Sequence, residues 1–279
     1  MARFDLERVL VALDGSPRAD AILSAVDRFP NPALTELVLL RVVARHSLRP
    51  SAEREADLHG AVGHLANLEK RLCEAGRKAH HYLCSGDPAE RILEAVDLLR
   101  PSLVAMSAHG AGEPSGPRGR VADAVLSRCP VPVLLGNPQS LPVDPGAGFA
   151  RIVVALDGSE ISARSLDPVA ALARADRSEV VLLYVDPDEQ DAKAREDVIR
   201  PYQRRLQTEG VERVRLRTTR GDPAHEVVEA LRAEGPDLLA MTSHARPDPK
   251  RRWFGSTAEV VVRHAVCPLL VVRVPAPRA

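Results

Sequence analysis

Short apolar runs alternate along the chain with segments in which apolar residues recur at helical spacing. Runs without polar alternation predict strands that are buried on both faces, as in a parallel sheet. The predicted strands are Val9–Leu13, Leu37–Val43, His81–Cys84, Leu103–Ser107 and Val131–Leu135, followed by Ile152–Leu156, Val180–Val185, Val214–Thr218, Leu238–Ser243 and Leu269–Val274. The helical stretches predicted in the first half are Ala19–Phe29, Leu58–Ala75, Ala89–Leu99 and Val121–Ser127. This alternation predicts doubly wound α/β domains.

The same segments occur twice, in the same order. Arg8-Val-Leu-Val-Ala-Leu-Asp-Gly-Ser16 returns as Arg151-Ile-Val-Val-Ala-Leu-Asp-Gly-Ser159, and Gly86-Asp-Pro-Ala89 returns as Gly221-Asp-Pro-Ala224. Because the period far exceeds the roughly 20–50 residues of solenoid repeats, each copy is a whole domain. The predicted domains are residues 1–136 (copy one) and 150–279 (copy two), with a linker rich in Pro and Gly at 137–149.

The second repeated motif predicts a helix start. Asp87 can cap the helix, Pro88 suits its first position, and Glu90 can reach back to the cap. Asp222 and Pro223 repeat the first two of these features.

Composition excludes several classes of protein. The 279 residues suffice for two cores, and 38 basic and 38 acidic residues give a formal net charge of 0, so we expect no nucleic-acid partner. The four cysteines form no Cys-x-x-Cys pair, which predicts reduced, buried thiols in a cytoplasmic protein and no metal site. No apolar run approaches about 20 residues and no signal peptide is recognisable, so we expect no membrane segment.

Candidate chemistry lies just after the predicted strands, because ligands of open α/β sheets bind beyond the carboxyl ends of strands where the strand order reverses. In copy one the segments are Asp14-Gly-Ser16, Ser107-Ala-His-Gly110 and Gly119-Arg120. In copy two they are Asp157-Gly-Ser159, Thr242-Ser-His-Ala245 and Gly255-Ser256. We therefore expect one potential site in each copy.

Val-Ala-Leu-Asp-Gly-Ser, Gly-Asp-Pro-Ala, a Met-x-x-His loop, and Gly-Ser-Thr-Ala-Glu before a final Cys-Pro-Leu-Leu-Val-Val resemble the universal stress protein family. The resemblance covers both halves and implies a tandem member. Each copy is then a five-stranded parallel sheet in the order 3-2-1-4-5 with helices on both faces. Single-domain relatives pair through their last strand, so we expect an intrachain pseudo-dimer; a homodimer through other faces is a further hypothesis.

ATP-binding members of this family carry Gly-x2-Gly-x9-Gly-[Ser/Thr] between the fourth strand and the last helix. Glycines let the backbone approach the phosphates, and amides at the helix N-terminus favour the anion. In copy one, Ser107 replaces the first glycine and Gly110 keeps the second. Eight residues then lead to Gly119, one short of nine, and Arg120 replaces the hydroxyl residue.

Copy two departs from the motif at its other end. Thr242 and Ala245 replace the two early glycines, and nine residues then lead to an intact Gly255-Ser256. A residue other than glycine at Ala245 costs about 1–3 kcal/mol of strain if the position needs positive φ.

The resemblance also implies positions around the nucleoside, with Asp14 and Asp157 bordering it and Val42 and Val185 edging the adenine. The candidate binding residues are Asp157, Val185, Thr242, His244, Ala245, Gly255, Ser256 and Thr257 in copy two, and Asp14, Val42, Ser107, Gly110, Gly119 and Arg120 in copy one.

Structural interpretations compete with several of these assignments. Ser256 and Glu259 also fit a capping box, and Arg120 can either bind phosphate or fill the pocket itself. Lys250-Arg-Arg-Trp-Phe254 fits a charged lid over phosphates, but also a solvated loop whose Trp anchors a subunit contact. His109 and His244 recur at matching places, where a loop-stabilising role is favoured over that of a base or metal ligand.

No catalytic motif is present. The Gly-x-Ser-x-Gly elbow, the Walker loop and the Gly-x-Gly-x-x-Gly turn are all missing, so we expect no enzyme, with slow ATP hydrolysis as the remaining alternative. The predicted function is a cytoplasmic stress-response regulator that binds adenine nucleotide (ATP) weakly, mainly in copy two. The alternative is a ligand-free scaffold that acts through an unknown protein partner.

Overall fold

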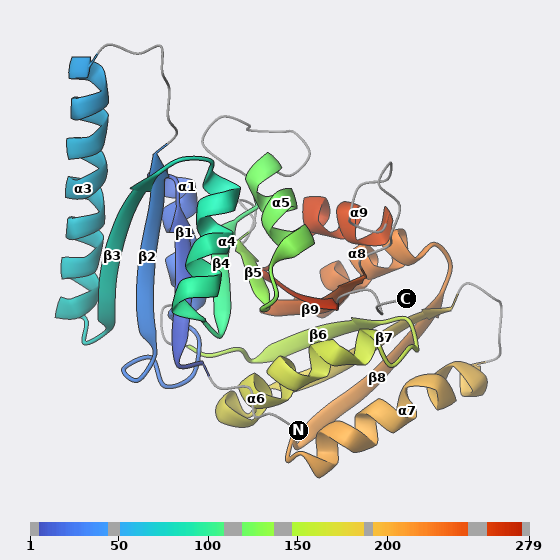
Figure 1. Cartoon of the computed structure of the whole chain (residues 1–279). Coiled ribbons are helices and arrows are strands. Elements are labelled where there is room, and N and C mark those ends of the chain that lie inside the picture. Colours follow the sequence, from blue (N-terminus) through green and yellow to red (C-terminus); the bar gives the residue numbers. More distant parts are fainter. Residues whose placement is uncertain are drawn as a thin grey trace.

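The two copies form one continuous sheet. The computed structural model describes residues 6–43, 51–108, 119–136, 147–186, 192–244 and 256–274. Ten strands within these ranges lie in the order β3-β2-β1-β4-β5-β10-β9-β6-β7-β8 (Figure 1). The elements of copy one are β1 (Arg8–Leu13), α1 (Pro17–Asp20), α2 (Ile22–Val26), β2 (Glu36–Val43), α3 (Ser51–Glu74), β3 (Lys78–Ser85), α4 (Pro88–Leu99), β4 (Leu103–Ser107), α5 (Arg120–Arg128) and β5 (Val133–Gly136). Those of copy two are β6 (Arg151–Leu156), η1 (Ser162–Ser165), α6 (Leu166–Asp176), β7 (Glu179–Asp186), α7 (Ala192–Thr208), β8 (Arg213–Arg220), α8 (Pro223–Glu234), β9 (Leu238–His244), α9 (Ser256–His264) and β10 (Leu269–Val274).

The predicted strand order is confirmed in both copies. Each half reads 3-2-1-4-5, and every neighbouring pair is parallel except β5 and β10. β5 and β10 are antiparallel, with Leu269 opposite Leu135 and Val271 opposite Val133. This junction is the expected intrachain pseudo-dimer.

Helices cover both faces of the sheet, and each hydrophobic layer runs through both copies. Side chains of α1, α2, α3, α6 and α7 pack on one face, and those of α4, α5, α8 and α9 pack on the other. The central strands are buried, whereas the edge strands β3 and β8 consist mostly of exposed and half-buried positions. The uninterrupted apolar runs of the sequence are therefore those of the interior strands.

A buried arginine, Arg28, links the two copies through contacts outside the sheet. Arg28 is 5% exposed; its Nε donates to the Gly148 carbonyl and its Nη2 to Asp237 Oδ1, both at 2.7 Å. Its guanidinium lies 4.9 Å from the centroid of the Phe149 ring, which meets Phe29 edge-on at 5.4 Å. Phe149 is fully buried, so the end of the predicted linker belongs to the core. Residues 137–146 of that linker lie outside the described residues.

Several predicted element boundaries differ from the structure. The helix predicted from Leu58 begins at Ser51, and the strand predicted from His81 begins at Lys78. The stretch predicted as one helix from Ala19 is two short helices, α1 and α2, and α1 begins at Pro17 with the Ser16 side chain as its cap. The last strand of copy one begins at Val133, two residues later than predicted. Pro132 supplies only its carbonyl to the Val104 amide, because proline has no N–H to donate.

The repeated helix start forms as predicted, with one exception. Asp87 accepts from the Glu90 amide at 3.0 Å, and Asp222 accepts from the His225 amide at 2.9 Å. The Glu90 carboxylate does not reach back to the cap but binds Arg128 of α5 with both oxygens.

The cysteines are free, but only two are buried. Burial raises the pKa of Cys129 to about 11 and that of Cys267 to about 12, so both stay protonated at neutral pH. Cys73 is exposed and Cys84 is half-buried, so the prediction of four buried thiols was wrong for these two. Cys73 lies on the solvent side of α3, and Cys84 lies on the edge strand β3.

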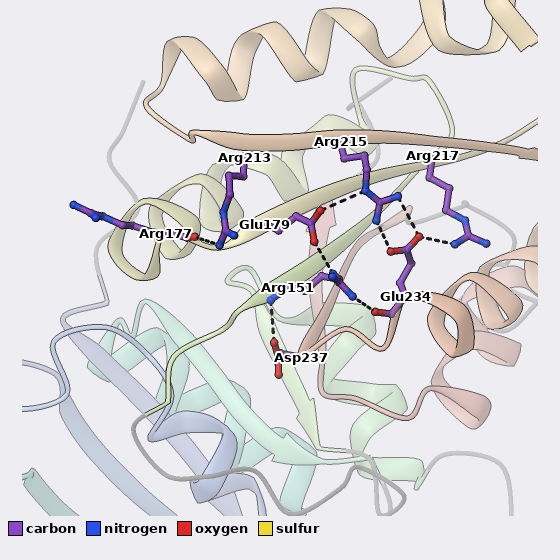
Figure 2. Close-up of polar contacts among 8 residues, drawn as sticks. All are labelled: Arg151, Arg177, Glu179, Arg213, Arg215, Arg217, Glu234 and Asp237. Carbon is purple, nitrogen blue, oxygen red and sulfur yellow. Dashed lines mark hydrogen bonds and ion pairs between the residues drawn. The ribbon is translucent and has the colours of Figure 1, made fainter.

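An arginine and glutamate network joins three strands of copy two to the end of α8 (Figure 2). Arg151 on β6 donates to Glu179 on β7 at 2.7 Å and also to the Glu234 carbonyl. Arg215 and Arg217 on β8 both bind the carboxylate of Glu234, which is 8% exposed. Hydrogen bonds from Arg215 and then Arg217 lower the pKa of Glu234 below its ordinary 4.5. The network therefore stabilises the fold only while Glu234 is ionised.

Glu234→Gln tests this network. A group whose pKa is depressed by folding stabilises the protein above its unfolded pKa, and this stability is lost as pH falls through the folded value. The variant should therefore lose about 2 kcal/mol of unfolding free energy at pH 7, the scale of hydrogen bonds to charged groups. The loss should begin to shrink as pH falls below the ordinary pKa of 4.5, where the unfolded carboxyl takes up a proton, and should vanish once pH is below the lowered pKa of the folded protein. Urea unfolding across pH measures both; an undiminished loss at pH 3 contradicts the assignment.

Glu90→Gln, whose ion pair is half-exposed, is the control and should change stability little.

Arg100 ends α4 in the left-handed region, with φ 48°, where copy two has Gly235 with φ 54° at the end of α8. An L-residue there is strained by about 1–2 kcal/mol, partly offset by the greater unfolded-state freedom of glycine. Arg100→Gly should therefore stabilise the protein by about 0.5–1 kcal/mol. Gly235→Arg is the matched reverse change and should destabilise it by a similar amount. Chemical denaturation measures both, and the same sign for both variants would refute the explanation.

Candidate functional site

A cavity of about 320 Å³ lies at the carboxyl ends of the first copy's strands, where the strand order reverses between β1 and β4. This volume is at the lower end of small-molecule pockets. Its lining comes from β1, β2, β4, α1, α4 and the start of α5: Ala12, Leu13, Asp14, Ala19, Leu40, Val42, Pro88, Ile92, Met106, Ser107, Ala108, Gly119, Arg120, Val121 and Ala122. Most of these side chains are apolar, so the cavity favours a flat or apolar group.

Polar groups lie on one side of this cavity. Asp14 and Arg120 are exposed, and Ser107 is half-buried. Asp14 Oδ1 accepts from the Ser16 amide at 2.8 Å, and Ser16 in turn caps α1, so the loop after β1 is fixed locally. The cavity thus combines an apolar interior with a carboxylate and a guanidinium.

The start of α5 is open to an anion. Gly119 is the N-cap with φ −56° and ψ 140°, and it has no side chain to accept from the first-turn amides. The Gly119 amide donates to the Ala108 carbonyl at 3.0 Å, which holds the helix start against the end of β4. Helix N-terminal amides carry partial positive charge, and Arg120 adds a full positive charge in the same turn. An anion bound there would satisfy the amides and offset the unfavourable placement of Arg120.

Gly15 shows why the loop after β1 needs glycine. Its φ is +84°, and a Cβ there would meet the Arg41 guanidinium at 2.5 Å. Gly158 of copy two has φ +82°, and a Cβ there would meet Val198 Cγ1 at 2.6 Å. The two copies thus keep the same turn but pack different side chains against it.

The structure brings together the five candidate residues of copy one that it describes. Asp14, Val42, Ser107, Gly119 and Arg120 all line the cavity. Gly110 lies outside the described residues, as does His109.

The apolar walls were missed by the sequence analysis. Leu40, Ile92 and Met106 face the cavity from three elements. No motif marks Leu40 or Ile92, and Met106, the first residue of the Met-x-x-His loop, was not assigned to the site. A signal did exist for Pro88, because the repeated Gly-Asp-Pro motif follows a strand and so lies at the same edge of the sheet.

In copy two, the turn after β6 is closed by its own polar groups. Asp157 Oδ1 accepts from the Ser159 amide at 2.9 Å and from the Ser159 hydroxyl at 2.6 Å. The Tyr202 hydroxyl of α7 donates to the Gly158 carbonyl at 2.9 Å. Val185, the counterpart of Val42, is buried at 8% exposure.

Thr242 has a structural partner. Its hydroxyl donates to the Ser162 carbonyl at 2.9 Å, and both residues are buried. This bond joins the end of β9 to η1, at the place where ATP-binding relatives are expected to have a glycine. The replacement of that glycine is therefore accompanied by a new packing contact.

The remaining candidates of copy two are only partly described. Thr257 is half-buried in the first turn of α9. His244 ends β9 and Ser256 begins α9, but their side chains lie outside the described residues. Ala245, Gly255 and the segment Lys250-Arg-Arg-Trp-Phe254 also lie outside them.

The described residues offer neither a metal position nor a membrane-spanning helix. Among those residues, no three His, Cys, Asp or Glu side chains converge on a possible metal position. None of the described helices combines the length and the apolar character that a membrane span requires.

The doubly wound sheet with a cavity at its switch point defines an open α/β fold, in which the carboxyl ends of the strands are the usual position for a ligand site. Within this fold class, the sequence model described as "Universal stress protein family" matches residues 6–135 and 148–273. The chain belongs to the universal stress protein family and contains two family domains in tandem.

Individual relatives agree with this assignment. The crystal structure of a universal stress protein from Archaeoglobus fulgidus is 22% identical, covers 96% of this chain and 99% of its own, and has a TM-score of 0.80. Universal stress protein YxiE of Bacillus subtilis is 24% identical over 147 residues, which are 45% of this chain and 99% of YxiE. Universal stress protein MJ0531 of Methanocaldococcus jannaschii is 26% identical over 143 residues, which are 46% of this chain and 84% of that protein.

Thr242→Val tests the structural role of Thr242. The change keeps the shape but removes one of two hydroxyl donors to the buried Ser162 carbonyl, the other being Ser165 at 2.8 Å, so it should cost about 0.5–1.5 kcal/mol. Thr242→Ser keeps the hydroxyl and should cost less. Equilibrium unfolding in urea measures both, and equal stabilities for the two variants would show that the hydroxyl contributes nothing.

Proposed function

We propose that this protein is a cytoplasmic stress-response regulator that binds an adenine nucleotide in the copy-one cavity. The supporting observation is that Asp14, Val42, Ser107, Gly119 and Arg120 line one cavity at the switch point of copy one. The apolar walls suit a base, and the Asp14 carboxylate can accept from ribose hydroxyls. The nucleotide would act by binding, without turnover.

The start of α5 is the proposed phosphate position. The uncapped amides after Gly119 and the Arg120 guanidinium both favour a negative group there. Arg120 takes the place of the hydroxyl residue in the family motif, so a salt-dependent contact would replace a neutral hydrogen bond.

Copy two was the favoured site from sequence because the spacing to Gly255 is intact. Two contacts of copy two support a different assignment: the Thr242 hydroxyl is engaged by the Ser162 carbonyl, and Asp157 accepts from the Ser159 hydroxyl in addition to the amide bond that Asp14 also makes. We therefore assign the nucleotide to copy one and a supporting structural role to copy two.

Gly119→Asp and Gly255→Asp form a matched pair that tests this assignment. An aspartate at an N-cap is favourable for the helix, so Gly119→Asp should fold normally, while its carboxylate repels phosphate. Wild type should bind ATP in calorimetry, and at about 100 times the dissociation constant its unfolding free energy should rise by about 2.7 kcal/mol. Gly119→Asp should lose this binding, and Gly255→Asp should retain it.

Each result decides between the alternatives. Loss of binding in Gly255→Asp alone would move the nucleotide to copy two. Absence of both released nucleotide and heat with millimolar ATP would favour the ligand-free scaffold. Release of ADP or AMP by wild type above the Gly119→Asp background would contradict binding without turnover.

A further inference from the structure

The outer edge of copy two carries a group of arginines that we call the arginine face. It consists of Arg213, Arg215 and Arg217 of β8 together with Arg151 and Arg177 (Figure 2). Alternate residues of a strand point to the same side, so the three β8 residues share the side on which α8 lies. Exposure is substantial: Arg213 is exposed, and the side chains of Arg215 and Arg217 are 44% and 31% exposed.

Positive charge is in excess on this face. Only three of its five guanidinium groups, those of Arg151, Arg215 and Arg217, bind carboxylates, which are Glu179 and Glu234. Arg215 uses all three of its nitrogens on these two groups, and Arg217 uses only Nη1.

Two arginines of the arginine face carry a positive charge that no carboxylate among the described residues neutralises. Arg213 donates to the carbonyl of Arg177 at 2.6 Å, which is a neutral acceptor. Among the described residues, neither Arg213 nor Arg177 has a carboxylate partner. The chain as a whole has a formal net charge of 0, so this surplus is local.

Copy one shows that the fold does not require these arginines. By strand register, Lys78, His80 and Tyr82 of β3 occupy the places of Arg213, Arg215 and Arg217. Both copies keep the structural pair between their first two strands: Arg8 binds Glu36 at 2.6 Å in copy one, as Arg151 binds Glu179 in copy two. The additional arginines of β8 are therefore an elaboration of copy two.

The edge of β8 is accessible from this side. β8 pairs only with β7 among the strands that the structure describes. On the opposite face α7 covers it, and Gln203 of α7 donates to the Val214 carbonyl at 2.9 Å. Among the residues that the structure describes, no helix covers the arginine side of the strand beyond the end of α8.

We propose that the arginine face binds an acidic, extended segment of a partner protein. Same-side residues of a strand recur about every 6.6 Å, which is also the repeat of alternate side chains in an extended peptide. Acidic side chains of such a peptide would therefore meet Arg213 and Arg217, which each use one nitrogen within the described part of the protein and lie on either side of the fully engaged Arg215. Guanidinium groups bind carboxylates in a planar, two-pronged geometry, which favours this partner.

A nucleic acid fits the face less well. Grooves that bind single strands combine positive charge with aromatic rings on which bases stack, and the arginine face contains no ring. This surface is separate from the copy-one cavity, so the proposal does not depend on nucleotide binding.

A synthetic peptide tests the proposal on the full chain. A fluorescent ten-residue peptide of alternating Glu and Thr should bind in anisotropy titrations, with an affinity that falls as salt rises. Arg213→Gln with Arg217→Gln should weaken binding by about tenfold or more, since each removes a charge-assisted hydrogen bond. Arg71→Gln with Lys78→Gln removes the same charge from exposed positions of copy one and should leave binding unchanged.

A second variant and a second measurement guard against misfolding. Arg213→Gln alone leaves the Glu234 network intact and should still weaken binding measurably. Hydrogen exchange with the peptide bound should slow the amides of β8 more than those of β3. The proposal is overturned if the peptide does not bind, if the copy-one variant weakens binding equally, or if a ten-nucleotide thymidine strand binds more tightly than the peptide.

Discussion

The antiparallel contact between β5 and β10 sets the architecture of the whole molecule. Each copy alone would end in an exposed strand with unpaired amides and carbonyls, which is a site for unwanted association. Pairing Val133–Leu135 with Leu269–Val271 removes both edges at once and makes one sheet from two. Arg28 then fixes the two copies from the side, through Asp237 and the Phe149 ring. Because this pairing occurs within one chain, it does not depend on protein concentration.

Because β5 pairs with β10 at the centre, β3 and β8 are the edge strands of the described sheet. The sequences of these two edge strands have diverged. β8 has acquired arginines at alternate positions, whereas β3 has a lysine, a histidine and an exposed tyrosine at the equivalent positions. Charged side chains at an edge oppose edge-to-edge pairing of sheets. The ion pairs with Glu179 and Glu234 let these arginines lie close together without strong mutual repulsion.

Sequence patterns located the ten strands that the structure describes. The interior strands are almost purely apolar because both of their faces are buried, whereas β3 and β8 mix polar and apolar residues. Sequence patterns did not predict features that depend on residues distant in the sequence but close in space. The break between α1 and α2 and the half-exposed Cys84 reflect local packing that periodicity does not carry. The candidate residues at the ends of strands were accessible from sequence, because the topology predicts where those ends meet. The apolar walls of the cavity were not, because Leu40 and Ile92 come from separate elements and resemble any other core residue.

The spacing within a motif gives only the length of a loop, so it does not show whether the site around that loop can bind a ligand. The intact spacing to Gly255 made copy two look more competent, yet the neighbouring Thr242 is committed to the Ser162 carbonyl and Asp157 to Ser159. In copy one the motif is shorter, but the strand ends, α4 and α5 leave room between them. An internal duplication allows this divergence, because each copy can lose a function that the other keeps while both still supply a strand to the central junction. The cavity of copy one and the arginine face of copy two are then two specialisations of one repeated scaffold.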